Sequence, residues 1–192
     1  MTSYWTLRES RCALVQLQLC TPRRKTLSHQ KEILPHEDIK VKEEEFQVTS
    51  VKIKTTSGTI TVATIYSPPR HNLKKEDYLI LVRSFSGKFI FGGDFNSKNT
   101  HWGSRLTNTK GSEIQHAIKM RKCEVHTTGK PTYWPTDGNK VPDLIGFFVS
   151  RNLSPRFMGV NEEFDMDSVH SPIVLMLSET INKKEQLFRT NN

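Results

Sequence analysis

The sequence predicts an α/β or α+β domain with a strand-rich core. Three short apolar runs support this, at residues 89–95, 143–149 and 171–177. Each has the length of a strand and is bounded by Gly, Pro or polar turn residues. Two further segments carry apolar residues at helical spacing, so the domain contains both kinds of element, with strands in the majority.

Length and charge narrow the class of protein. A chain of 192 residues is long enough for one domain with a sizeable core. The net charge of +8 favours a polyanionic partner such as nucleic acid, and a solvated basic surface is the alternative. Three cysteines match neither a metal site nor a disulfide framework, which favours a reducing compartment. The apolar run at residues 13–20 is too short to span a membrane, and we expect no targeting segment.

The two ends of the chain differ from its middle. Residues 1–26 carry two basic clusters around the apolar run and show no clear helical or strand period. We therefore predict a leader over residues 1–26, a domain over residues 27–178 and a polar tail over residues 179–192.

A β-hairpin opens the ordered part. Apolar-leaning and polar residues alternate over 47–54, and residues 59–66 form a second β-rich run. Ser57 and Gly58 form the turn between them. Pro68 and Pro69 end the second strand, because proline cannot continue a central strand.

Helices and strands then alternate along the chain. Helical spacing predicts helices over 73–85 and 111–121, and the apolar run at 89–95 is the central strand between them. Residues 101–105 read as a loop. Short β-like pieces follow at 123–128 and 132–134, ahead of the strong strands at 143–149 and 171–177.

Asp94 and Asn96 stand at the end of the central strand, after two glycines. Side chains two apart on a strand point to the same face, so both would face one pocket. The carboxylate can take a proton from water, and the amide can donate to a phosphate without adding negative charge. The alternative is an Asx turn that closes a hairpin.

Tyr66, Asp143 and His170 also stand where a strand meets a loop, and sites are usually built there. Together with Asp94 and Asn96 they would make a phosphodiesterase site. Each also has a structural alternative: Tyr66 as a strand aromatic, Asp143 as a turn residue and His170 as a hydrogen-bonded histidine near a strand start.

Six phrases of the sequence occur in a family-specific order. They are Ile65-Tyr-Ser-Pro-Pro69, Gly92-Gly-Asp-Phe-Asn96, His101-Trp-Gly-Ser-Arg105, Pro131-Thr-Tyr-Trp-Pro135, Pro142-Asp-Leu-Ile145 and His170-Ser-Pro172. Over about residues 27–178 the chain resembles the apurinic-type endonuclease domain of jockey-like non-LTR retrotransposons. That domain belongs to the endonuclease/exonuclease/phosphatase superfamily.

The resemblance implies a four-layer α/β sandwich that nicks DNA with Mg²⁺ or Mn²⁺ in its cleft. It implies that Asp94 orients or deprotonates the attacking water and that Asn96 and Tyr66 contact the phosphate. His170 would stabilise the pentacovalent oxygens, held in its tautomer by Asp143. Trp102 and Arg105 would shape the loop beside the site and contact DNA, with loop packing as the alternative for both. A phosphate or DNA contact is also expected from Lys98.

The sequence departs from the family at its metal site. The family's first two strands, which end in Asn and in a metal-binding Glu, find no match here, so we expect the first strands to be missing. Glu9 and Glu32 follow no run of β-forming residues. Val169 replaces a family Asp beside His170, and Asp167 is a weak substitute because two residues of strand displace it by about 6–7 Å.

These departures lead us to expect a retrotransposon-type endonuclease domain with weak or absent activity. The alternative is a non-catalytic nucleic-acid-binding remnant or co-opted domain. The retroelement phrases argue against a phosphatase of the same superfamily. The resemblance further implies DNA as partner, a fused reverse transcriptase and a nuclear or cytoplasmic location, and we assume a monomer.

Overall fold

The computed structural model describes residues 2–9, 13–20, 33–35, 46–55, 58–162 and 169–178. Asp167, Glu32 and the expected tail lie outside these residues. Over the described part of the chain, no helix is both long and apolar enough to cross a membrane.

Within the described residues, ten strands form two sheets. The larger sheet has the order β3-β4-β5-β6-β8-β7 and the smaller one the order β1-β2-β10-β9. The strands are β1 Thr2–Glu9, β2 Ala13–Cys20, β3 Ile33–Pro35, β4 Gln47–Thr55, β5 Gly58–Tyr66, β6 Lys88–Asp94, β7 Glu124–His126, β8 Gly146–Arg151, β9 Met158–Glu162 and β10 Ile173–Ser178. The helices are α1 Lys75–Ser84 and α2 Thr109–Met120, with short 3-10 turns η1 Thr100–Trp102 and η2 Pro155–Phe157.

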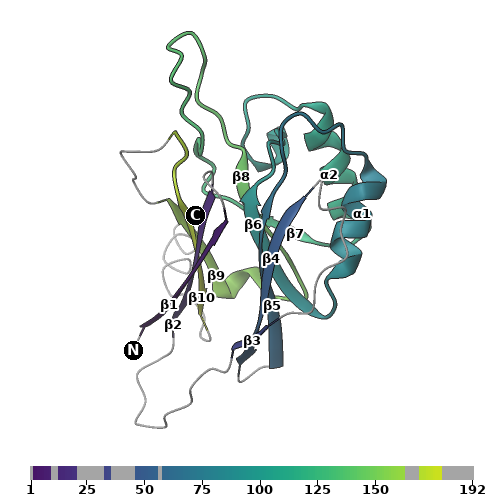
Figure 1. Ribbon diagram of the computed structural model, residues 1–192, viewed down its shortest axis with the longest axis vertical. Helices are drawn as coiled ribbons and strands as arrows, with labels where there is room; N and C mark the ends of the chain where they lie inside the picture. Colours follow the sequence, from purple (N-terminus) through teal and green to yellow (C-terminus); the bar gives the residue numbers. More distant parts are fainter. Residues whose placement is uncertain are drawn as a thin grey trace, which may run out of the picture.

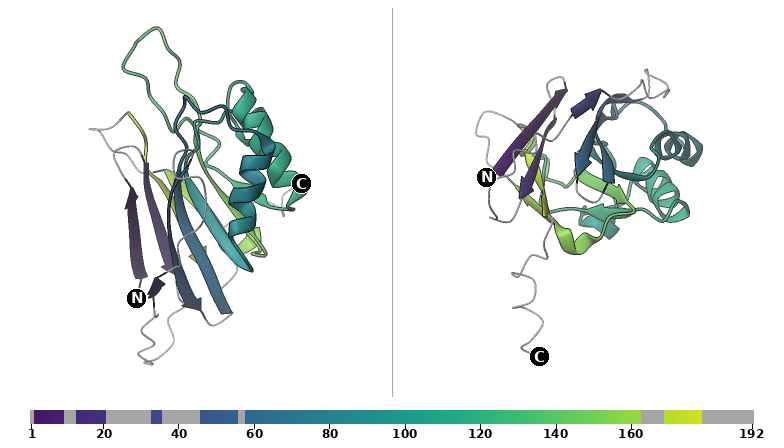
Figure 2. Two further views of the ribbon diagram at one scale, coloured as in Figure 1. Left: turned by 45° about the vertical axis from the view of Figure 1, so that its right-hand side comes forward. Right: turned by 90° about the horizontal axis from the view of Figure 1, so that it is seen from below.

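The elements stack as helices, larger sheet and smaller sheet (Figures 1 and 2). Both α1 and α2 cover the outer face of the larger sheet, and the smaller sheet packs on its other face. These are three of the four layers expected from the sequence. Among the described residues no helix covers the outer face of the smaller sheet.

Two apolar cores hold the layers together. One lies between the helices and the larger sheet, and includes Tyr78 and Leu81 of α1 and Phe89 and Phe91 of β6, all 1% exposed or less. The other lies between the sheets, and includes Ile90 of β6 opposite residues of β9 and β10. The strand β6 therefore serves both cores, because its side chains alternate between the two faces of the sheet.

The predicted hairpin and helices are confirmed. Strands β4 and β5 pair antiparallel, and β5 pairs parallel with β6 through the crossover that contains α1. Helix α1 begins and ends within two residues of the predicted bounds, and α2 begins two residues earlier than predicted and ends one earlier. Residues 132–134 make isolated bridges through Tyr133 rather than the expected strand.

The N-terminus requires a correction, because strands are present where we expected the first ones to be missing. Strand β1 pairs antiparallel with β2, and β2 pairs parallel with β10. Backbone hydrogen bonds of a ladder form without regard to side-chain type, so a segment with no alternating pattern can still complete a sheet. The prediction that the family-like domain begins at residue 27, after a leader over residues 1–26, stays a prediction.

Candidate active site

Strand ends from both sheets meet at one end of the molecule. Tyr66 and Asp94 are register partners at the carboxyl ends of the parallel strands β5 and β6. Asp94 is also level with Gly146, where the antiparallel strand β8 begins. The backbone of Tyr133 bridges to both Asp143 and His170, so it joins the segment before β8 to the segment before β10. The structure thus brings all five predicted catalytic residues to one end of the fold.

A tight turn connects Asp94 to Asn96. The backbone N–H of Asn96 donates to Oδ1 of Asp94 at 2.8 Å, and its Nδ2 donates to Oδ2 at 3.2 Å. Asn96 has a φ of 48°, in the left-handed region that Asn tolerates. The two side chains therefore meet through an Asx-type turn, not through strand alternation as the sequence suggested. The turn closes no hairpin, because β6 is followed by a loop and α2.

The glycine before Asp94 is required by a close backbone approach. Gly93 has a φ of 149°, and a Cβ on it would lie 2.0 Å from the carbonyl oxygen of Ile65 in β5. No side chain fits there without moving the neighbouring strand. Gly93 thereby allows β5 and β6 to bring Tyr66 and Asp94 level at the site.

Asp94 is a buried residue, 3% exposed. This burial raises the pKa of its carboxyl group to about 6. The N–H groups of Asn96 and the ammonium of Lys110 act in the other direction and limit this rise. Asp94 is therefore ionised at neutral pH but remains basic enough to accept a proton from water.

His170 lies beside Asp94, with Nδ1 4.0 Å from Oδ2. Its imidazole also packs on the ring of Tyr133, with ring centroids 5.0 Å apart. Burial lowers the pKa of His170, so the ring is neutral at pH 7. A neutral imidazole can donate one hydrogen bond to a developing negative charge at this position.

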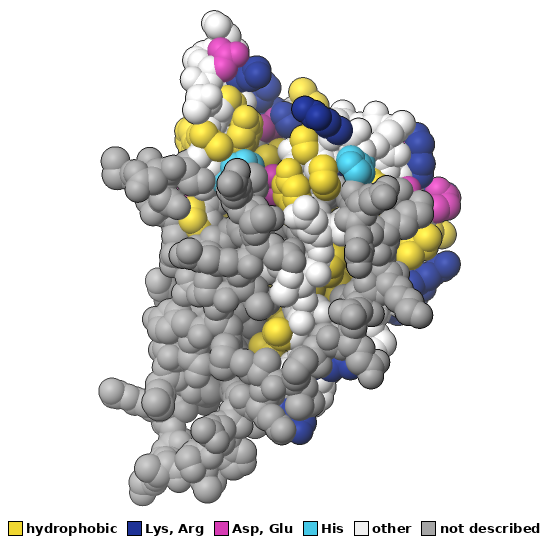
Figure 3. Space-filling view, viewed as in Figure 1, with side chains coloured by type: hydrophobic (Ala, Val, Ile, Leu, Met, Phe, Trp, Pro, Cys, Tyr) yellow, Lys and Arg dark blue, Asp and Glu magenta, His cyan; other side chains and the backbone are white. Residues whose placement is uncertain are grey.

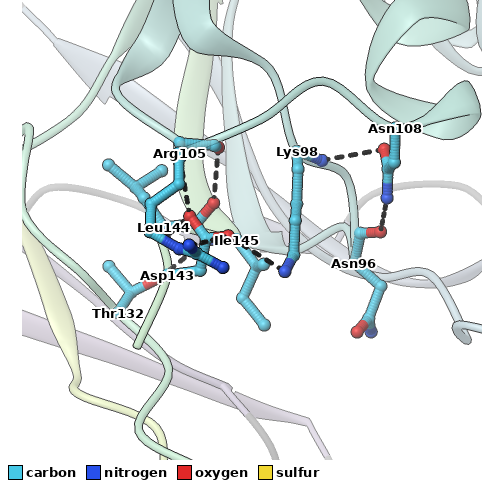
Figure 4. A network of polar contacts seen from close by, with 9 residues as sticks. Asn96, Lys98, Arg105, Asn108, Thr132, Asp143, Leu144 and Ile145 are labelled. Atoms are coloured by element: carbon cyan, nitrogen blue, oxygen red, sulfur yellow. Dashed lines mark hydrogen bonds and ion pairs between the residues drawn. The ribbon is translucent and has the colours of Figure 1, made fainter. Parts of the chain in front are cut away.

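The second aspartate, Asp143, has a different set of partners (Figure 4). Its Oδ1 accepts hydrogen bonds from the backbone N–H groups of Arg105 and Leu144, both at 3.0 Å. Its Oδ2 lies 2.9 Å from Nζ of Lys98 and 3.9 Å from Nε of Arg105. The role expected for Asp143, to hold the tautomer of His170, stays a prediction.

Trp102 requires a second correction. The sequence suggested a DNA contact, but the residue is 3% exposed, and its ring lies 4.6 Å from that of Phe147 in the core. An indole buried in this way contacts no ligand at the surface. Trp102 instead anchors η1, as in the loop-packing alternative, and it thereby positions Arg105 on the segment that follows.

Sequence reasoning missed two residues of the α2 N-terminus, Asn108 and Lys110. Asn108 caps α2 through the N–H of Gly111 at 2.7 Å, and it also binds the loop after β6, accepting from the N–H of Lys98 and donating to the carbonyl of Asn96 (Figure 4). Lys110 is 7% exposed. The signal for Asn108 was available, because Asn directly before a helical run is a typical N-cap. Lys110 carried no such signal.

The described residues do not fit a divalent metal site by themselves. They contain no group of three or more His, Cys, Asp or Glu side chains that could hold a metal ion. Asp143 is already paired with Lys98, and Val169 offers no donor atom. Mg²⁺ prefers several hard oxygen ligands, so the one carboxylate of Asp94 is insufficient.

The register places Glu9 at the end of the smaller sheet where β10 begins, shortly after His170 in the sequence. Glu9 is the last residue of β1 and pairs with Ala13, while β2 pairs with the beginning of β10 from Val15 and Ile173 onward. The objection that no β-forming run precedes Glu9 is therefore wrong.

Cationic groups gather at this end of the molecule. Each of them has an acidic partner: Lys98 and Arg105 pair with Asp143, Lys130 with Glu162 and Lys140 with Asp137. The segment between β7 and β8 projects from the upper end of the ribbon in Figure 1, and Figure 3 shows basic and acidic side chains together at that end. The side chain of Arg105 is 51% exposed, so its guanidinium is accessible to a phosphate group while it lies near Asp143.

Comparison with known proteins agrees with the geometry. The model of the family described as endonuclease-reverse transcriptase matches residues 60–174. The chain is 31% identical over 143 residues to the RNA-directed DNA polymerase from mobile element jockey of Drosophila melanogaster. The aligned stretch covers 74% of this chain and 16% of that protein. It is 25% identical over 131 residues to the probable RNA-directed DNA polymerase from transposon BS of the same organism, covering 68% and 14%.

The chain thus spans about a sixth of the length of the relatives it matches. Among solved structures, the endonuclease domain of TRAS1, a telomere-specific non-LTR retrotransposon, is similar with a TM-score of 0.65, at 21% identity, covering 78% of this chain and 70% of that one. This similarity confirms the predicted fold. The match of the family model over more than half of the sequence shows that this chain belongs to the endonuclease-reverse transcriptase family.

Proposed function

We propose that this chain is the endonuclease domain of a non-LTR retrotransposon and hydrolyses a DNA phosphodiester bond. The observation that supports this most directly is the pair of Asp94 and His170, with Oδ2 and Nδ1 4.0 Å apart at the strand ends. A carboxylate with a pKa of about 6 and a neutral imidazole suit water activation and charge stabilisation at neutral pH.

In the proposed reaction, a water molecule attacks the phosphorus and transfers its proton to Asp94. The new oxygen–phosphorus bond forms as the bond from phosphorus to the leaving sugar oxygen breaks, and that oxygen takes a proton from solvent. His170 donates a hydrogen bond to the phosphoryl oxygens. Lys98 and Arg105 bind the flanking phosphates, held in place by Asp143.

Asn96 has a narrower role in this proposal than the sequence suggested. Its Nδ2 already donates to the carbonyl oxygen of Ser67 and to Asp94, both at 3.2 Å. A contact to phosphate would require one of these partners to be released. We therefore assign Asn96 to the orientation of Asp94.

A specific observation favours a second candidate function, DNA binding without cleavage. The described part of the chain lacks a group of three metal-binding side chains, and Val169 stands where the family has an Asp. The family relationship implies a divalent cation, Mg²⁺ or Mn²⁺, but the described residues supply too few ligands for it. Loss of such a site would leave the cationic side chains of Lys98 and Arg105 and remove the chemistry.

Nicking of supercoiled plasmid by the purified protein tests both candidates, with Mg²⁺, with Mn²⁺ and with chelator. Cleavage that depends on metal and is lost in Asp94→Ala supports the endonuclease. A folded protein that retards plasmid without cutting it supports the binding domain. Equal cutting by wild type and Asp94→Ala contradicts the assignment of Asp94 and indicates a contaminating nuclease.

The relatives also suggest the context of the domain. They are RNA-directed DNA polymerases several times longer than this chain. We propose that a reverse transcriptase is fused to this domain in the complete element, that DNA is the partner of this domain, and that the protein acts in the nucleus or the cytoplasm.

A further inference from the structure

Lys110 is a buried cation that the proposed reaction does not use. It lies in the first turn of α2 and is 7% exposed. Lysine is rarely buried, because an ammonium group loses several kcal/mol of hydration in the interior of a protein. The cost requires compensation from specific partners, and these partners indicate what the lysine does.

The partners of Lys110 belong to the loop that follows β5. Its Nζ donates to Oγ of Ser67 at 2.8 Å and to the carbonyl oxygen of Pro68 at 2.8 Å, and it lies 3.5 Å from the carbonyl oxygen of Ser67. These contacts span 42 or 43 residues of sequence. They fasten the loop after β5 to the start of α2.

The same loop holds Asn96. The carbonyl oxygen of Ser67 accepts a hydrogen bond from Nδ2 of Asn96 at 3.2 Å, and the other contact of that amide is Oδ2 of Asp94 at 3.2 Å. The backbone N–H of Ser67 donates to the carbonyl oxygen of Asp94 at 3.0 Å. Ser67 is therefore the junction between Lys110 and the two residues at the end of β6.

A second feature fixes the start of α2 against the loop that follows β6. A Cβ on Gly111 would lie 1.7 Å from the carbonyl oxygen of Lys98, so only glycine allows the helix to start there. Asn108 then accepts from the backbone N–H of Lys98 and donates to the carbonyl oxygen of Asn96, both in the loop between β6 and α2. Lys110 is thus presented to Ser67 by a rigid backbone, which favours a fixed orientation of its ammonium group.

The charges of Lys110 and Asp94 also act on each other. Burial lowers the pKa of Lys110 to about 8, and the carboxylate of Asp94 opposes this shift. In return the ammonium lowers the pKa of Asp94 against the effect of burial. Lys110 is therefore an internal countercharge for a site in which the described residues offer no metal cluster.

We infer that Lys110 is a positioning residue of the site: through Ser67 it fixes the amide of Asn96, and so the carboxylate of Asp94, in the orientation needed for water attack. This rests on the proposed function only for its effect on cleavage. The effect on Asn96 follows from the contacts themselves and can be measured in a protein that does not cut DNA.

The test compares Lys110→Met with Lys119→Met, a matched control that removes the same charge from an exposed position of the same helix. We expect Lys110→Met to lower kcat for plasmid nicking about 30-fold, within the range for a misplaced catalytic group. The Kd for DNA should stay within about twofold, because Lys110 is buried away from the phosphates. Lys119→Met should leave kcat unchanged.

A second variant covers the case in which Lys110→Met does not fold. Lys110→Gln keeps N–H donors for Ser67 and Pro68 but removes the charge, and we expect a smaller loss of kcat, about fivefold, again with Kd unchanged. Wild-type kcat in both Lys110 variants would overturn the inference. A fall in kcat together with a comparable rise in the Kd for DNA would also overturn it, because such parallel changes indicate a general effect on folding.

The side-chain amide signals of Asn96 in ¹H–¹⁵N NMR spectra give a readout that needs no activity. In the wild type, two hydrogen bonds hold this amide, so its two protons should exchange slowly with water. Lys110→Met should speed that exchange at least tenfold, and Lys119→Met should not. Unchanged Asn96 signals in Lys110→Met contradict the inference, whether or not the wild type nicks DNA. Absence of nicking together with the Asn96 effect would instead refute only the proposed function.

Discussion

Asp94 and Asp143 are both buried at the same end of the molecule, yet their pKa values shift in opposite directions. Burial raises the pKa of Asp94 to about 6, because two N–H groups of one neighbour and a buried ammonium compensate only in part. Burial also raises that of Asp143, but there the N–H groups of Arg105 and Leu144 and the ammonium of Lys98 prevail, so the pKa is lowered.

The difference teaches that burial alone does not assign a role to a carboxylate. A carboxylate with several strong donors is a structural anion, since it is stable as it is and has little tendency to take a proton. A carboxylate with few donors is poised for proton transfer. This criterion favours Asp94 as the proposed base, whereas Asp143 pairs with Lys98 and Arg105.

The largest expected effect is on cleavage by Asp94→Asn, which removes the proton acceptor and keeps the shape of the side chain. We expect nicking to fall about 10³-fold, as for loss of a general base. Single-turnover nicking assays measure this. The nicking rate of Asp143→Asn should fall much less, about tenfold. Equal losses in the two variants would contradict the assignment of Asp94, rather than Asp143, as the proton acceptor.

The next effect is on the pH dependence of stability. The folded-state pKa of Asp94 lies above its unfolded value of 3.8, so its ionisation destabilises the fold as pH rises from about 4 to 6. A shift of about two pKa units corresponds to about 3 kcal/mol. Asp94→Asn should therefore gain up to about 3 kcal/mol of unfolding free energy relative to the wild type between pH 4 and pH 7, measured by urea unfolding. A relative loss over that range would show that Asp94 is well solvated or well paired.

Asp143→Asn should show the opposite sign. The lowered pKa of Asp143 means that its ionised form stabilises the fold above its unfolded pKa, and that this contribution is lost as pH falls through the folded value. At pH 7 we expect a loss of about 2 kcal/mol, because an amide presents donors to the N–H groups and cations that now face it. Urea unfolding at pH 7 and pH 3 measures this, and the deficit should shrink at the lower pH.

The smallest effects concern the two cations that Asp143 holds. Lys98→Met and Arg105→Met should each weaken DNA binding a few-fold and reduce the slope of log K against log salt by about 1. Fluorescence anisotropy in a KCl series measures this, with Lys119→Met as the control. Slopes equal to that of the control would show that Lys98 and Arg105, the two cations next to Asp143, do not bind DNA phosphates.

Much of the fold could be predicted from the sequence, because local signals agreed with tertiary contacts. The hairpin β4–β5, the helices α1 and α2 and the central strand β6 all carry clear periodicity and clear turn residues. Strands β1, β2, β3 and β9 were missed. β2 pairs with β10, which is distant in sequence, and no local pattern reports such a pairing. β1, β3 and β9 pair with strands next to them in chain order, but their sequences show no clear strand period.

The site was predicted as a set of residues more successfully than as a geometry. Motif order indicated Asp94, Asn96, Asp143 and His170, and the structure brings them to one end of the fold. The left-handed turn at Asn96, the burial of Trp102 and the pairing of Asp143 with Lys98 depend on side-chain packing between elements. Lys110 could not be found at all, since one lysine in a basic chain carries no pattern.

The parallel pairing of β2 with β10 has a consequence for the order of biosynthesis. Val15 pairs with Ile173, so the smaller sheet can close only after the ribosome has released the segment that contains β10. The strands of the larger sheet, except for β3, lie within residues 47–151 and can assemble earlier, with Asp94 and Asn96 already in place. His170 joins them last. During synthesis, the nascent domain therefore holds half of its site and gains the other half only when the two sheets meet.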